Sequence, residues 1–393
     1  MEIKSLLDTD LYKLTMMQVV YHHFSDSTAR FVFKNRTQNT VFTPEMAQEI
    51  KHNIESLEYL FLTLHEKRYL ETSVPFLSQD FINYLSRFHF NMEYVTLQYT
   101  EDLQELHIEV NGPWVETILF EVPILAIVNS IYFKHQTKKE DTDQIYESAL
   151  TYMDHEICKL LKTSTKFADF GTRRRFSAEW HRLILQKLKE TPYLVGTSNV
   201  YLAKKLNLKP IGTMAHEFIQ AGQAFVHPRD SQQYMLDIWA EEYQGNLGIA
   251  LSDTLGFKYF LHDFNLKFMK LYDGVRLDSG DPEEQCRALL KHYQSHNIDP
   301  LTKTVVFSDG LDFDRAAHLQ FLFGDCIKVA FGIGTFITNS IPGYSPLQIV
   351  MKMTHCNGLD VAKISDTPGK TMCKNPVYLK YLQHVIQSEL SSS

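Results

Sequence analysis

The chain has 393 residues, of which 44% are hydrophobic and 22% are charged, so it can bury at least one large core and exceeds a single (β/α)8 domain by about one small domain. Its formal net charge of -8 at pH 7 argues against a protein that coats nucleic acid, and any polyanionic ligand must be held by a local basic cluster. The five cysteines are scattered without a CxxC pair, which fits a reducing compartment and argues against a structural zinc site.

Two segments bear on the location of the protein. The first eight residues lack an apolar core of the kind found in signal peptides, and the longest apolar stretch, residues 118–128, is interrupted by Glu121 and Pro123. Neither a signal peptide nor a membrane span is expected from these patterns. The sequence therefore predicts a cytoplasmic protein without membrane contact.

The first 140 residues or so have the pattern of an α+β domain. A helix is predicted after Asp8-Thr9-Asp10-Leu11-Tyr12 and through Val20, and apolar-polar alternation predicts a strand over residues 29–34. A helical region follows at 43–64. Alternation returns over 97–110 and ends at a predicted turn, Asn111-Gly112-Pro113.

From about Phe167 the pattern changes to short apolar runs that end in Gly or Asp and precede helical stretches. Seven such runs occupy residues 167–171, 193–196, 209–212, 247–252, 270–275, 304–308 and 327–331. This repeated βα pattern predicts parallel strands, and seven of them indicate a barrel or part of one. The pattern ends after Asn339, where residues 348–353 and 361–364 predict a hairpin able to return to the N-terminal domain.

A histidine opens one of the predicted helices. The segment Gly212-Thr213-Met214-Ala215-His216-Glu217 places His216 at the mouth of a βα unit, with Glu217 either orienting its ring or favouring the helix N-terminus. One of 17 histidines is weak evidence alone, because surface and core histidines are commoner. Three other junctions, residues 169–175, 196–199 and 273–282, carry anion-binding or carboxylate side chains, and such junctions are where an α/β enzyme builds its site.

The first of these junctions is basic. Arg173-Arg174-Arg175 follows a strand end and Gly171. A solvated helix face is the plain alternative for such a run, but amides at a helix N-terminus favour anions and arginine binds phosphate through two donors. The position therefore favours a phosphate or pyrophosphate site.

Two further junctions are acidic, and a glycine-rich one follows. Residues 273–282 hold three carboxylates around Arg276, which suits Mg-bound phosphates and a hydroxylated sugar, although turns explain the same composition. Ser308-Asp309-Gly310-Leu311-Asp312 repeats the arrangement one unit later. Phe331-Gly332-Ile333-Gly334-Thr335 lacks the third glycine of a dinucleotide fingerprint, because Ile337 stands there, so a backbone nest for phosphate is the better interpretation.

Seven segments together carry a resemblance to a known family. They are Asp8-Thr9-Asp10-Leu11-Tyr12-Lys13, Gly112-Pro113-Trp114 with Glu116, Phe170-Gly171-Thr172-Arg173-Arg174, Gly196-Thr197-Ser198-Asn199, the His216 segment, Arg276-Leu277-Asp278-Ser279-Gly280 and Phe331-Gly332-Ile333-Gly334-Thr335. In this order, from about residue 8 to 340, they resemble the nicotinate phosphoribosyltransferase family.

The resemblance implies a type II phosphoribosyltransferase fold of the α/β class. An irregular, incomplete (β/α) barrel, expected over residues 141–340, packs against an α+β domain formed from the N- and C-terminal parts, residues 1–140 with 341–393. The implied reaction joins nicotinate to phosphoribosyl pyrophosphate, giving nicotinate mononucleotide and pyrophosphate with coupled ATP hydrolysis and Mg2+, as the entry step of NAD salvage. A homodimer with shared active sites is also implied.

The resemblance assigns roles to individual residues. His216 accepts the γ-phosphoryl group of ATP and becomes a phosphohistidine, which reorganises the site. Asp278 and Asp309 face the positive charge that develops on the ribose. Phe170 stacks on one side of the pyridine ring, and Tyr12 of the partner subunit stacks on the other.

Other residues are assigned to substrate binding. Arg276 binds near the nicotinate carboxylate or the phosphates, and the sequence leaves the two open. Arg173 and Arg174 are the candidates for the 5-phosphate and pyrophosphate. The remaining expected contacts come from backbone at glycine positions, namely Gly171, Gly310, Gly332 and Gly334.

Ser198 bears on the choice of substrate. The nicotinamide phosphoribosyltransferase that shares this fold has an acid at this position, which would repel the carboxylate of nicotinate, so Ser198 favours the acid substrate. Capping of the helix that begins near Val200 is the structural alternative. Quinolinate phosphoribosyltransferase, another alternative, needs a larger basic pocket for two carboxylates and does not need a phosphorylatable histidine. The alternative from a different class is a sugar-phosphate aldolase or isomerase, with Lys328 as its Schiff-base lysine.

Overall fold

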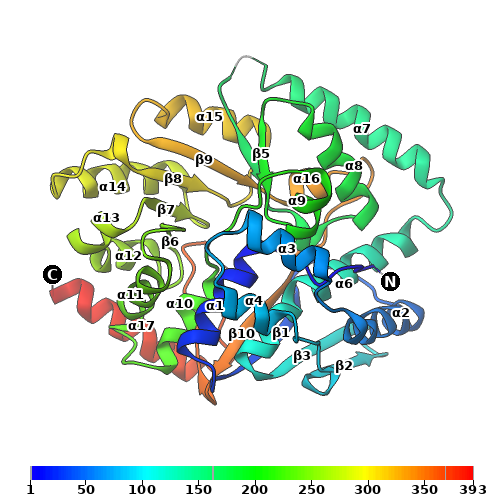
Figure 1. Ribbon diagram of the computed structural model, residues 1–393, viewed down its shortest axis with the longest axis horizontal. Coiled ribbons are helices and arrows are strands. Elements are labelled where there is room, and N and C mark those ends of the chain that lie inside the picture. Colours follow the sequence, from blue (N-terminus) through cyan, green and yellow to red (C-terminus); the bar gives the residue numbers. More distant parts are fainter. Residues whose placement is uncertain (1, 162, 368, 393) are drawn as a thin grey trace.

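The computed structural model describes residues 2–161, 163–367 and 369–392, and it contains two separate sheets (Figure 1). One has five strands in the order β11 (Leu359–Asp360), β10 (Ile349–Cys356), β1 (Thr28–Asn35), β3 (Glu105–Pro113) and β2 (Val95–Thr100). The other has six, in the order β5 (Leu194–Thr197), β4 (Phe167–Asp169), β9 (Lys328–Ile333), β8 (Thr304–Phe307), β7 (Gly274–Leu277) and β6 (Ile249–Leu251). The mixed α/β class predicted from the sequence is confirmed.

The five-stranded sheet is antiparallel and joins the two ends of the chain. β10 pairs with β1 from Ala29 opposite Cys356 to Asn35 opposite Ile349, so the C-terminal part of the chain returns to the N-terminal sheet as predicted. The predicted turn at residues 111–113 is wrong, because these residues belong to β3 and pair with residues 28–30 of β1. Pairing with a neighbouring strand overrides the local turn preference of this segment.

The six-stranded sheet is parallel throughout its described pairs. Six of the seven predicted βα runs form its strands. The seventh, residues 209–212, contributes only an isolated bridge between Pro210 and Thr197, and the proline offers no N–H to a neighbouring strand on the other side. The ladder ends at β5 and β6 among the described residues, so closure into a barrel and the domain boundaries at 140 and 340 stay predictions.

Seventeen helices and six 3-10 turns are described around the two sheets. The helices of the first half are α1 (Leu11–His23), α2 (Pro44–Glu55), α3 (Leu64–Ser73), α4 (Gln79–Leu85), α5 (Trp114–Thr117), α6 (Glu121–Gln136), α7 (Thr142–Cys158) and α8 (Ala178–Lys189). Those of the second half are α9 (Val200–Leu206), α10 (His216–Ala221), α11 (Ser231–Tyr243), α12 (Phe257–Asp263), α13 (Leu266–Leu271), α14 (Pro282–Ser295), α15 (Phe313–Phe323), α16 (Thr335–Thr338) and α17 (Pro376–Ser392). The 3-10 turns are η1 (Ser56–Tyr59), η2 (Met92–Tyr94), η3 (Ile118–Phe120), η4 (Thr172–Arg174), η5 (Gly222–Ala224) and η6 (Pro300–Thr302).

Two helices, α1 and α6, form much of the core. Every residue of α1 from Leu11 to Val20 is buried. The helical region Trp114–Gln136, which includes α6, is long and apolar enough to cross a membrane, with a mean hydropathy of 1.6, but 94% of its most apolar window is buried inside the protein. Burial of this extent is typical of the core helix of a soluble protein.

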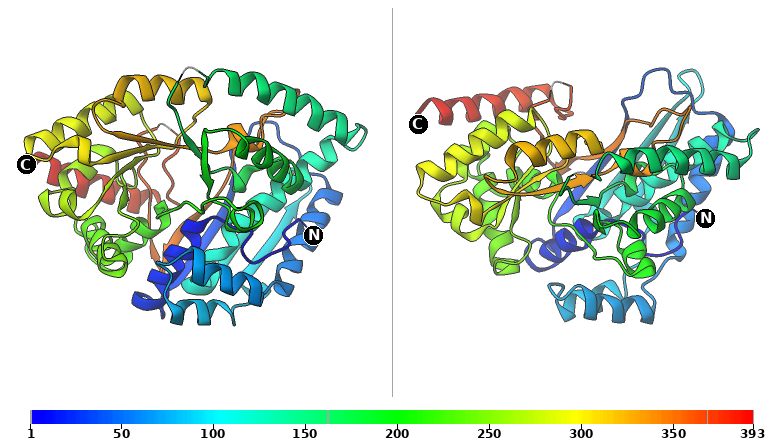
Figure 2. Two further views of the ribbon diagram at one scale, coloured as in Figure 1. Left: turned by 45° about the horizontal axis from the view of Figure 1, so that its top comes forward. Right: turned by 90° about the horizontal axis from the view of Figure 1, so that it is seen from above.

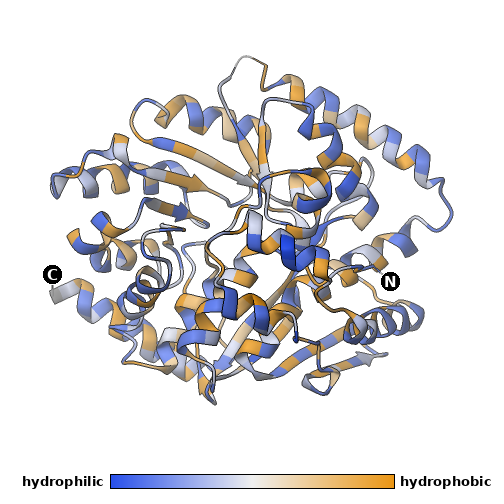
Figure 3. Cartoon of the chain, in the orientation of Figure 1, coloured by the Kyte–Doolittle hydropathy of each residue, from blue (hydrophilic) through white to orange (hydrophobic). Residues whose placement is uncertain are grey.

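The arrangement brings segments that are far apart in the sequence side by side. In the views of Figures 1 and 2, β10 runs along β1, while α17 lies at the far end of the molecule beside α12, with which it is in contact. Peripheral helices such as α2 and α7 carry both hydrophilic and hydrophobic residues along their length (Figure 3), as expected of helices that pack one face on a core. The carboxyl ends of the parallel strands face the region of β10, α1 and α10, and this is where the site lies.

Candidate active site

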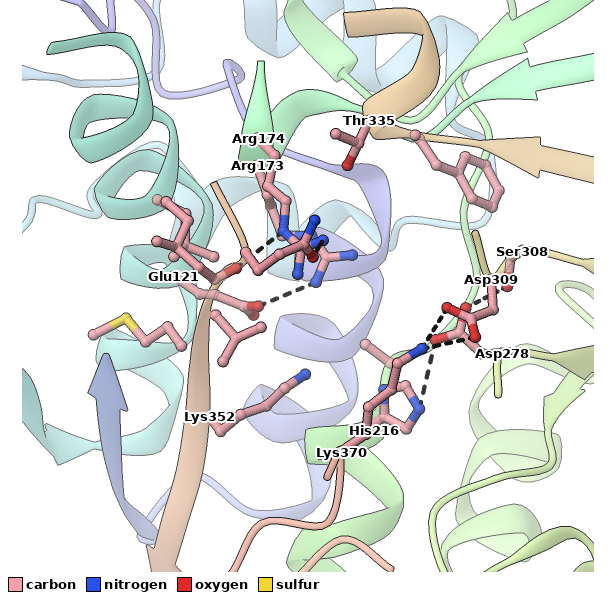
Figure 4. Close-up of a pocket in the computed structure, with 18 of the residues that line it drawn as sticks. Glu121, Arg173, Arg174, His216, Asp278, Ser308, Asp309, Thr335, Lys352 and Lys370 are labelled. Atoms are coloured by element: carbon pink, nitrogen blue, oxygen red, sulfur yellow. Dashed lines mark hydrogen bonds and ion pairs between the residues drawn. The ribbon is translucent and has the colours of Figure 1, made fainter. Parts of the chain in front are cut away.

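A cavity of about 540 Å³ opens at the carboxyl ends of the parallel strands, between them and β10. Its wall includes most of the side chains and backbone segments predicted as site residues: Tyr12, Phe170, Gly171, Arg173, Arg174, His216, Arg276, Asp278, Asp309, Gly310 and Gly334. In Figure 4, Arg173 and Arg174 lie on one side of the space, and His216, Asp278 and Asp309 lie on another. Ligands of open parallel sheets bind at this end of the strands.

Two aromatic rings line the cavity, and an arginine lies over each. The guanidinium carbon of Arg173 is 5.6 Å from the ring centre of Tyr12, and that of Arg276 is 5.7 Å from the ring centre of Phe170. Tyr12 was expected to enter the site of a partner subunit. In the single chain that the structure describes, Tyr12 lines the cavity of its own chain, and the preceding turn is anchored by Asp8, which accepts two hydrogen bonds from buried Arg175 at 2.7 and 2.9 Å.

The three consecutive arginines bind different partners. Arg173 pairs with Glu121 at 3.3 Å, and Arg174 donates to the backbone oxygen of Ile349 at 3.0 Å. Both line the cavity, and burial lowers the pKa of Arg174 to about 10. Arg175 is 1% exposed and is used in the pair with Asp8. The basic run therefore supplies two cations to the cavity and one to the core.

His216 is held by Asp253 and Lys363. Its Nε2 atom lies 2.7 Å from Asp253 Oδ1, 2.8 Å from Lys363 Nζ and 3.6 Å from Asp278 Oδ2. Lys363 and Ser279 both donate to the second oxygen of Asp253, at 2.8 and 2.7 Å. Nδ1 has no hydrogen-bond partner among the described residues, so it is the ring nitrogen left for a ligand.

The surroundings of His216 keep its ring uncharged. Burial lowers the pKa of His216 to about 4, although Asp253 opposes the shift. When Nε2 donates its proton to Asp253, the lone pair of the neutral ring is on Nδ1. This is the form of imidazole that acts as a nucleophile near neutral pH.

Glu217 does not orient His216, contrary to the prediction. Its Oε2 atom is 2.6 Å from Nζ of Lys13, and the same ammonium is 2.6 Å from Glu121 Oε2. Burial raises the pKa of Glu217. For Glu121 the effect of burial is outweighed by Lys13 and Arg173, which lower its pKa to about 2. Asp253 has the orienting role, and Glu217 belongs to a buried charge network below the cavity.

The acidic side of the cavity is formed by the loops after β7 and β8. Asp278 accepts from Arg276 at 2.8 Å and from Ser308, and Arg276 also donates to Ser308 at 2.7 Å. Although burial opposes it, Arg276 and His216 lower the pKa of Asp278 to about 2, so the carboxylate is ionised. Asp309 contacts Lys370 with both oxygens at 2.7 Å.

Comparisons with known proteins match nearly the whole chain. The model of the nicotinate phosphoribosyltransferase (NAPRTase) family matches residues 165–390, and that of its N-terminal domain matches residues 7–129. The chain is 47% identical over 394 residues to a nicotinate phosphoribosyltransferase of Burkholderia mallei, with 98% of this chain and 97% of that protein covered. It is 48% identical over 393 residues to one of Cupriavidus necator, with 98% of each covered.

Solved structures agree with the sequence comparisons. A crystal structure of nicotinate phosphoribosyltransferase from Vibrio cholerae has a TM-score of 0.94 and 37% sequence identity, over 98% of this chain and 94% of that chain. The chain belongs to the nicotinate phosphoribosyltransferase family. It is therefore an enzyme, and the resemblance noted in the sequence is confirmed.

Two predicted site residues, Ser198 and Gly332, do not line the cavity. Ser198 is 3% exposed, and its hydroxyl donates to Asp10 at 2.7 Å, while Asn199 caps α9. Neither the substrate contact nor the capping alternative describes it. Gly332 faces the ring of Phe170, and a Cβ built there would lie 2.2 Å from two ring carbons. Its missing side chain makes room for Phe170.

Four side chains that line the cavity or contact His216 were not predicted from the sequence. Asp253 follows β6, where a search of the residue after each predicted strand would have found it. Arg36, Lys352 and Lys363 lie near or on the returning strand β10, and no local pattern marks them. Lys352 lines the cavity, forms no hydrogen bond or ion pair with a described residue, and has its pKa lowered to about 8 by burial.

One group of three side chains near the cavity has the residue types of a metal site. Atoms of His216, Asp253 and Asp278 lie within 4.8 Å of one another, but the ammonium of Lys363 lies 2.8 Å from both His216 and Asp253, so a cation already occupies that position. Mg2+ usually takes one or two carboxylates together with substrate phosphates and water. Asp309, with its side chain 36% exposed in the cavity wall, has the donor chemistry for such an ion, which would have to displace Lys370 from its two oxygens.

Lys328 does not support the aldolase alternative. It is exposed and begins β9, so it lies at the amino end of that strand and outside the cavity wall. A Schiff-base lysine must face the substrate.

Proposed function

We propose that this enzyme transfers the 5-phosphoribosyl group of phosphoribosyl pyrophosphate to nicotinate and couples the transfer to ATP hydrolysis through a phosphohistidine at His216. The observation that carries the proposal is the single cavity in which an uncharged, buried histidine faces an ionised Asp278, two aromatic rings and a set of cations. Nicotinate phosphoribosyltransferases of known sequence match 98% of the chain, which supports the same reaction. The product would be nicotinate mononucleotide, which enters NAD salvage.

The pyridine ring of nicotinate would lie between Tyr12 and Phe170, where stacking contributes about 0.5–1.5 kcal/mol beyond burial. Arg276 lies over Phe170, so it is the candidate to bind the nicotinate carboxylate. The positive charge of Arg276 favours the carboxylate of nicotinate over the uncharged amide of nicotinamide, which is the alternative substrate. Arg173 lies over Tyr12 and adds a second positive charge near the ring.

The phosphates of the second substrate would lie among the remaining cations. The cavity is also lined by Arg36, Arg174, Lys352, Lys363 and Lys370. Arginine and lysine bind phosphates through charge-assisted hydrogen bonds. Mg2+ held by Asp309 would neutralise charge on the pyrophosphate.

In the reaction, a bond forms between the pyridine nitrogen and C1 of the ribose. The bond from C1 to the pyrophosphate oxygen breaks, and the electron pair leaves with pyrophosphate. Positive charge develops on the ribose, and the fixed carboxylate of Asp278 is placed to stabilise it. Arg276 and Ser308 hold Asp278 in position.

ATP would use the same cavity at His216. Nδ1 attacks the γ-phosphorus, the bond to the β-γ bridging oxygen breaks, and ADP leaves. The phosphohistidine adds about 1.5–2 negative charges next to Asp278 and Lys363, which rearranges the site before hydrolysis releases phosphate. We further propose that the protein acts in the cytoplasm as a homodimer, in which each chain supplies its own Tyr12.

A product assay tests the proposal. Purified enzyme receives phosphoribosyl pyrophosphate and Mg2+ with nicotinate, nicotinamide or quinolinate, each with and without ATP, and the nucleotides are separated by chromatography. Nicotinate mononucleotide should form fastest with ATP present, and His216→Ala should retain only a slow, ATP-independent transfer without ATP hydrolysis. Preferential use of nicotinamide or quinolinate would contradict the proposed substrate, and full ATP hydrolysis by His216→Ala would contradict the phosphohistidine.

A further inference from the structure

A chain of buried charges connects the helix of His216 with the aromatic wall of the cavity. Lys13 is fully buried and bridges Glu217 on α10 and Glu121 on α6, at 2.6 Å from each. Glu121 also pairs with Arg173 at 3.3 Å through its other oxygen. The two ends of this network are joined to the cavity through the backbone, since His216 directly precedes Glu217 and Tyr12 directly precedes Lys13.

The network has an uneven distribution of contacts. One ammonium serves two carboxylates, and Glu217 keeps a second oxygen, Oε1, that is buried without a hydrogen-bond partner. The bond from Arg173 to Glu121 is longer than either bond of Lys13, and the Tyr12 hydroxyl is also buried without a partner. Lys13 can therefore give up its contact with Glu121 while it keeps the one with Glu217, and Glu121 has room to move toward Arg173.

A phosphoryl group on His216 would disturb this balance. It brings negative charge beside Glu217, in surroundings where charges are poorly screened. Lys13 is the cation closest to Glu217, at 2.6 Å, so its pairing would shift toward that carboxylate. Glu121 would then bind Arg173 more tightly and draw the guanidinium along the ring of Tyr12.

We infer that Lys13 is a positioning residue that transmits the phosphorylation of His216 to Arg173 and Tyr12, and so to the binding of nicotinate. The inference rests on the proposed phosphohistidine. It requires no contact of Lys13 with substrate, since Lys13 lies beneath the cavity and is absent from its wall. Because coupling between two binding events is reciprocal, nicotinate should also change the phosphorylation level of His216.

The test compares Lys13→Met with wild type in two measurements: 32P labelling of His216 from γ-labelled ATP, and the nicotinate KM with and without ATP. In wild type, ATP should lower this KM. In Lys13→Met, labelling should stay within about twofold of wild type while the effect of ATP on the nicotinate KM falls below about twofold. Lys13→Arg keeps the charge and should restore part of the effect.

Lys159 provides the matched control. It also bridges two carboxylates, Glu156 at 2.8 Å and Asp314 at 2.7 Å, but at the surface and away from the cavity. Lys159→Met should keep the full effect of ATP. Loss of the effect in this variant as well would overturn the specific role of Lys13.

A second variant covers the case in which Lys13→Met does not fold, as judged by circular dichroism. Lys13→Met/Glu217→Gln removes one charge of each sign and leaves Glu121 paired with Arg173, and it should show the same loss of the ATP effect. A folded, labelled variant of either kind with the full ATP effect on the nicotinate KM would overturn the inference alone. A wild-type chain that takes up no label would overturn the proposed phosphohistidine, and the inference with it.

Discussion

The reactivity of a single side chain, His216, depends on what surrounds it. Asp253 binds Nε2 at 2.7 Å, and Ser279 and Lys363 hold Asp253 in turn. Burial disfavours the charged ring more than Asp253 favours it. The result is an imidazole that is neutral and oriented before any ligand binds, as nucleophilic catalysis requires.

This description predicts the titration of His216. Since burial lowers its pKa to about 4, the ring should stay neutral from about pH 8 down to about pH 5, whereas an unperturbed histidine gains its proton near about pH 6.5. NMR of the ring Cε1–H group, assigned with His216→Gln, measures this directly. A midpoint near the unperturbed value would contradict the account of the site.

A second residue-scale prediction concerns Ser198. Its hydroxyl lies against the carboxylate of buried Asp10 and away from the cavity. Ser198→Asp should therefore reduce the free energy of unfolding by at least about 2 kcal/mol, because it puts a second carboxylate beside a buried one. Urea denaturation measures the loss.

The matched variant Ser198→Ala separates stability from specificity. It should leave the ratio of kcat/KM for nicotinate and nicotinamide within about twofold of wild type, since Ser198 is not in the cavity wall. A tenfold change in this ratio, about 1.4 kcal/mol, would restore Ser198 to the substrate site.

At the scale of elements, the loop after β4 and the strand β9 fit together through a glycine. Phe170 lies against Gly332, and its backbone N–H donates to Ile333 at 2.9 Å. Gly332→Ala should push the Phe170 ring into the cavity, because the new methyl group would overlap the ring carbons. The nicotinate KM should rise at least about fivefold.

Labelling of His216 by ATP serves as the internal control for Gly332→Ala, since His216 lies on a different element. It should stay close to the wild-type level. An unchanged nicotinate KM in this folded variant would show that Phe170 is not a wall of the nicotinate site.

The elements also show what the sequence alone can predict. The runs that form strands β4 to β9 could be predicted because buried parallel strands are continuous and apolar. Pro210 lies in the one predicted run that does not form a strand of the sheet. The arginine run was correctly placed at a site, but its third member, Arg175, is in the core, because the turn at η4 points consecutive side chains in different directions. Lys352 and Lys363 were invisible, since their role depends on where the C-terminal part of the chain returns.

At the scale of the whole molecule, the two sheets contribute different chemistry to one cavity. The parallel sheet supplies the carboxylates and Phe170 from its loops. The antiparallel sheet supplies Lys352 from β10. A protein with a net charge of -8 thus concentrates cations at one place, which suits small polyanionic substrates.

The placement of Tyr12 predicts the outcome of subunit mixing. Each chain contains its own Tyr12 and its own Asp278 in one cavity. Mixing inactive Tyr12→Ala with inactive Asp278→Ala should therefore restore no activity, even when tagged chains show that subunits have exchanged, because every cavity keeps one defect. Recovery of activity in the mixture would show that Tyr12 acts in a neighbouring subunit.

The central claim is that one cavity transfers a phosphoribosyl group to nicotinate and uses ATP alongside. A single 31P NMR time course tests it most directly, because phosphoribosyl pyrophosphate, pyrophosphate, ATP, ADP and phosphate are all visible in one sample. With nicotinate and Mg2+ present, pyrophosphate should appear together with nicotinate mononucleotide in equal amounts, and ADP and phosphate should rise with them. Consumption of phosphoribosyl pyrophosphate that does not depend on nicotinate, or none at all, would contradict the account.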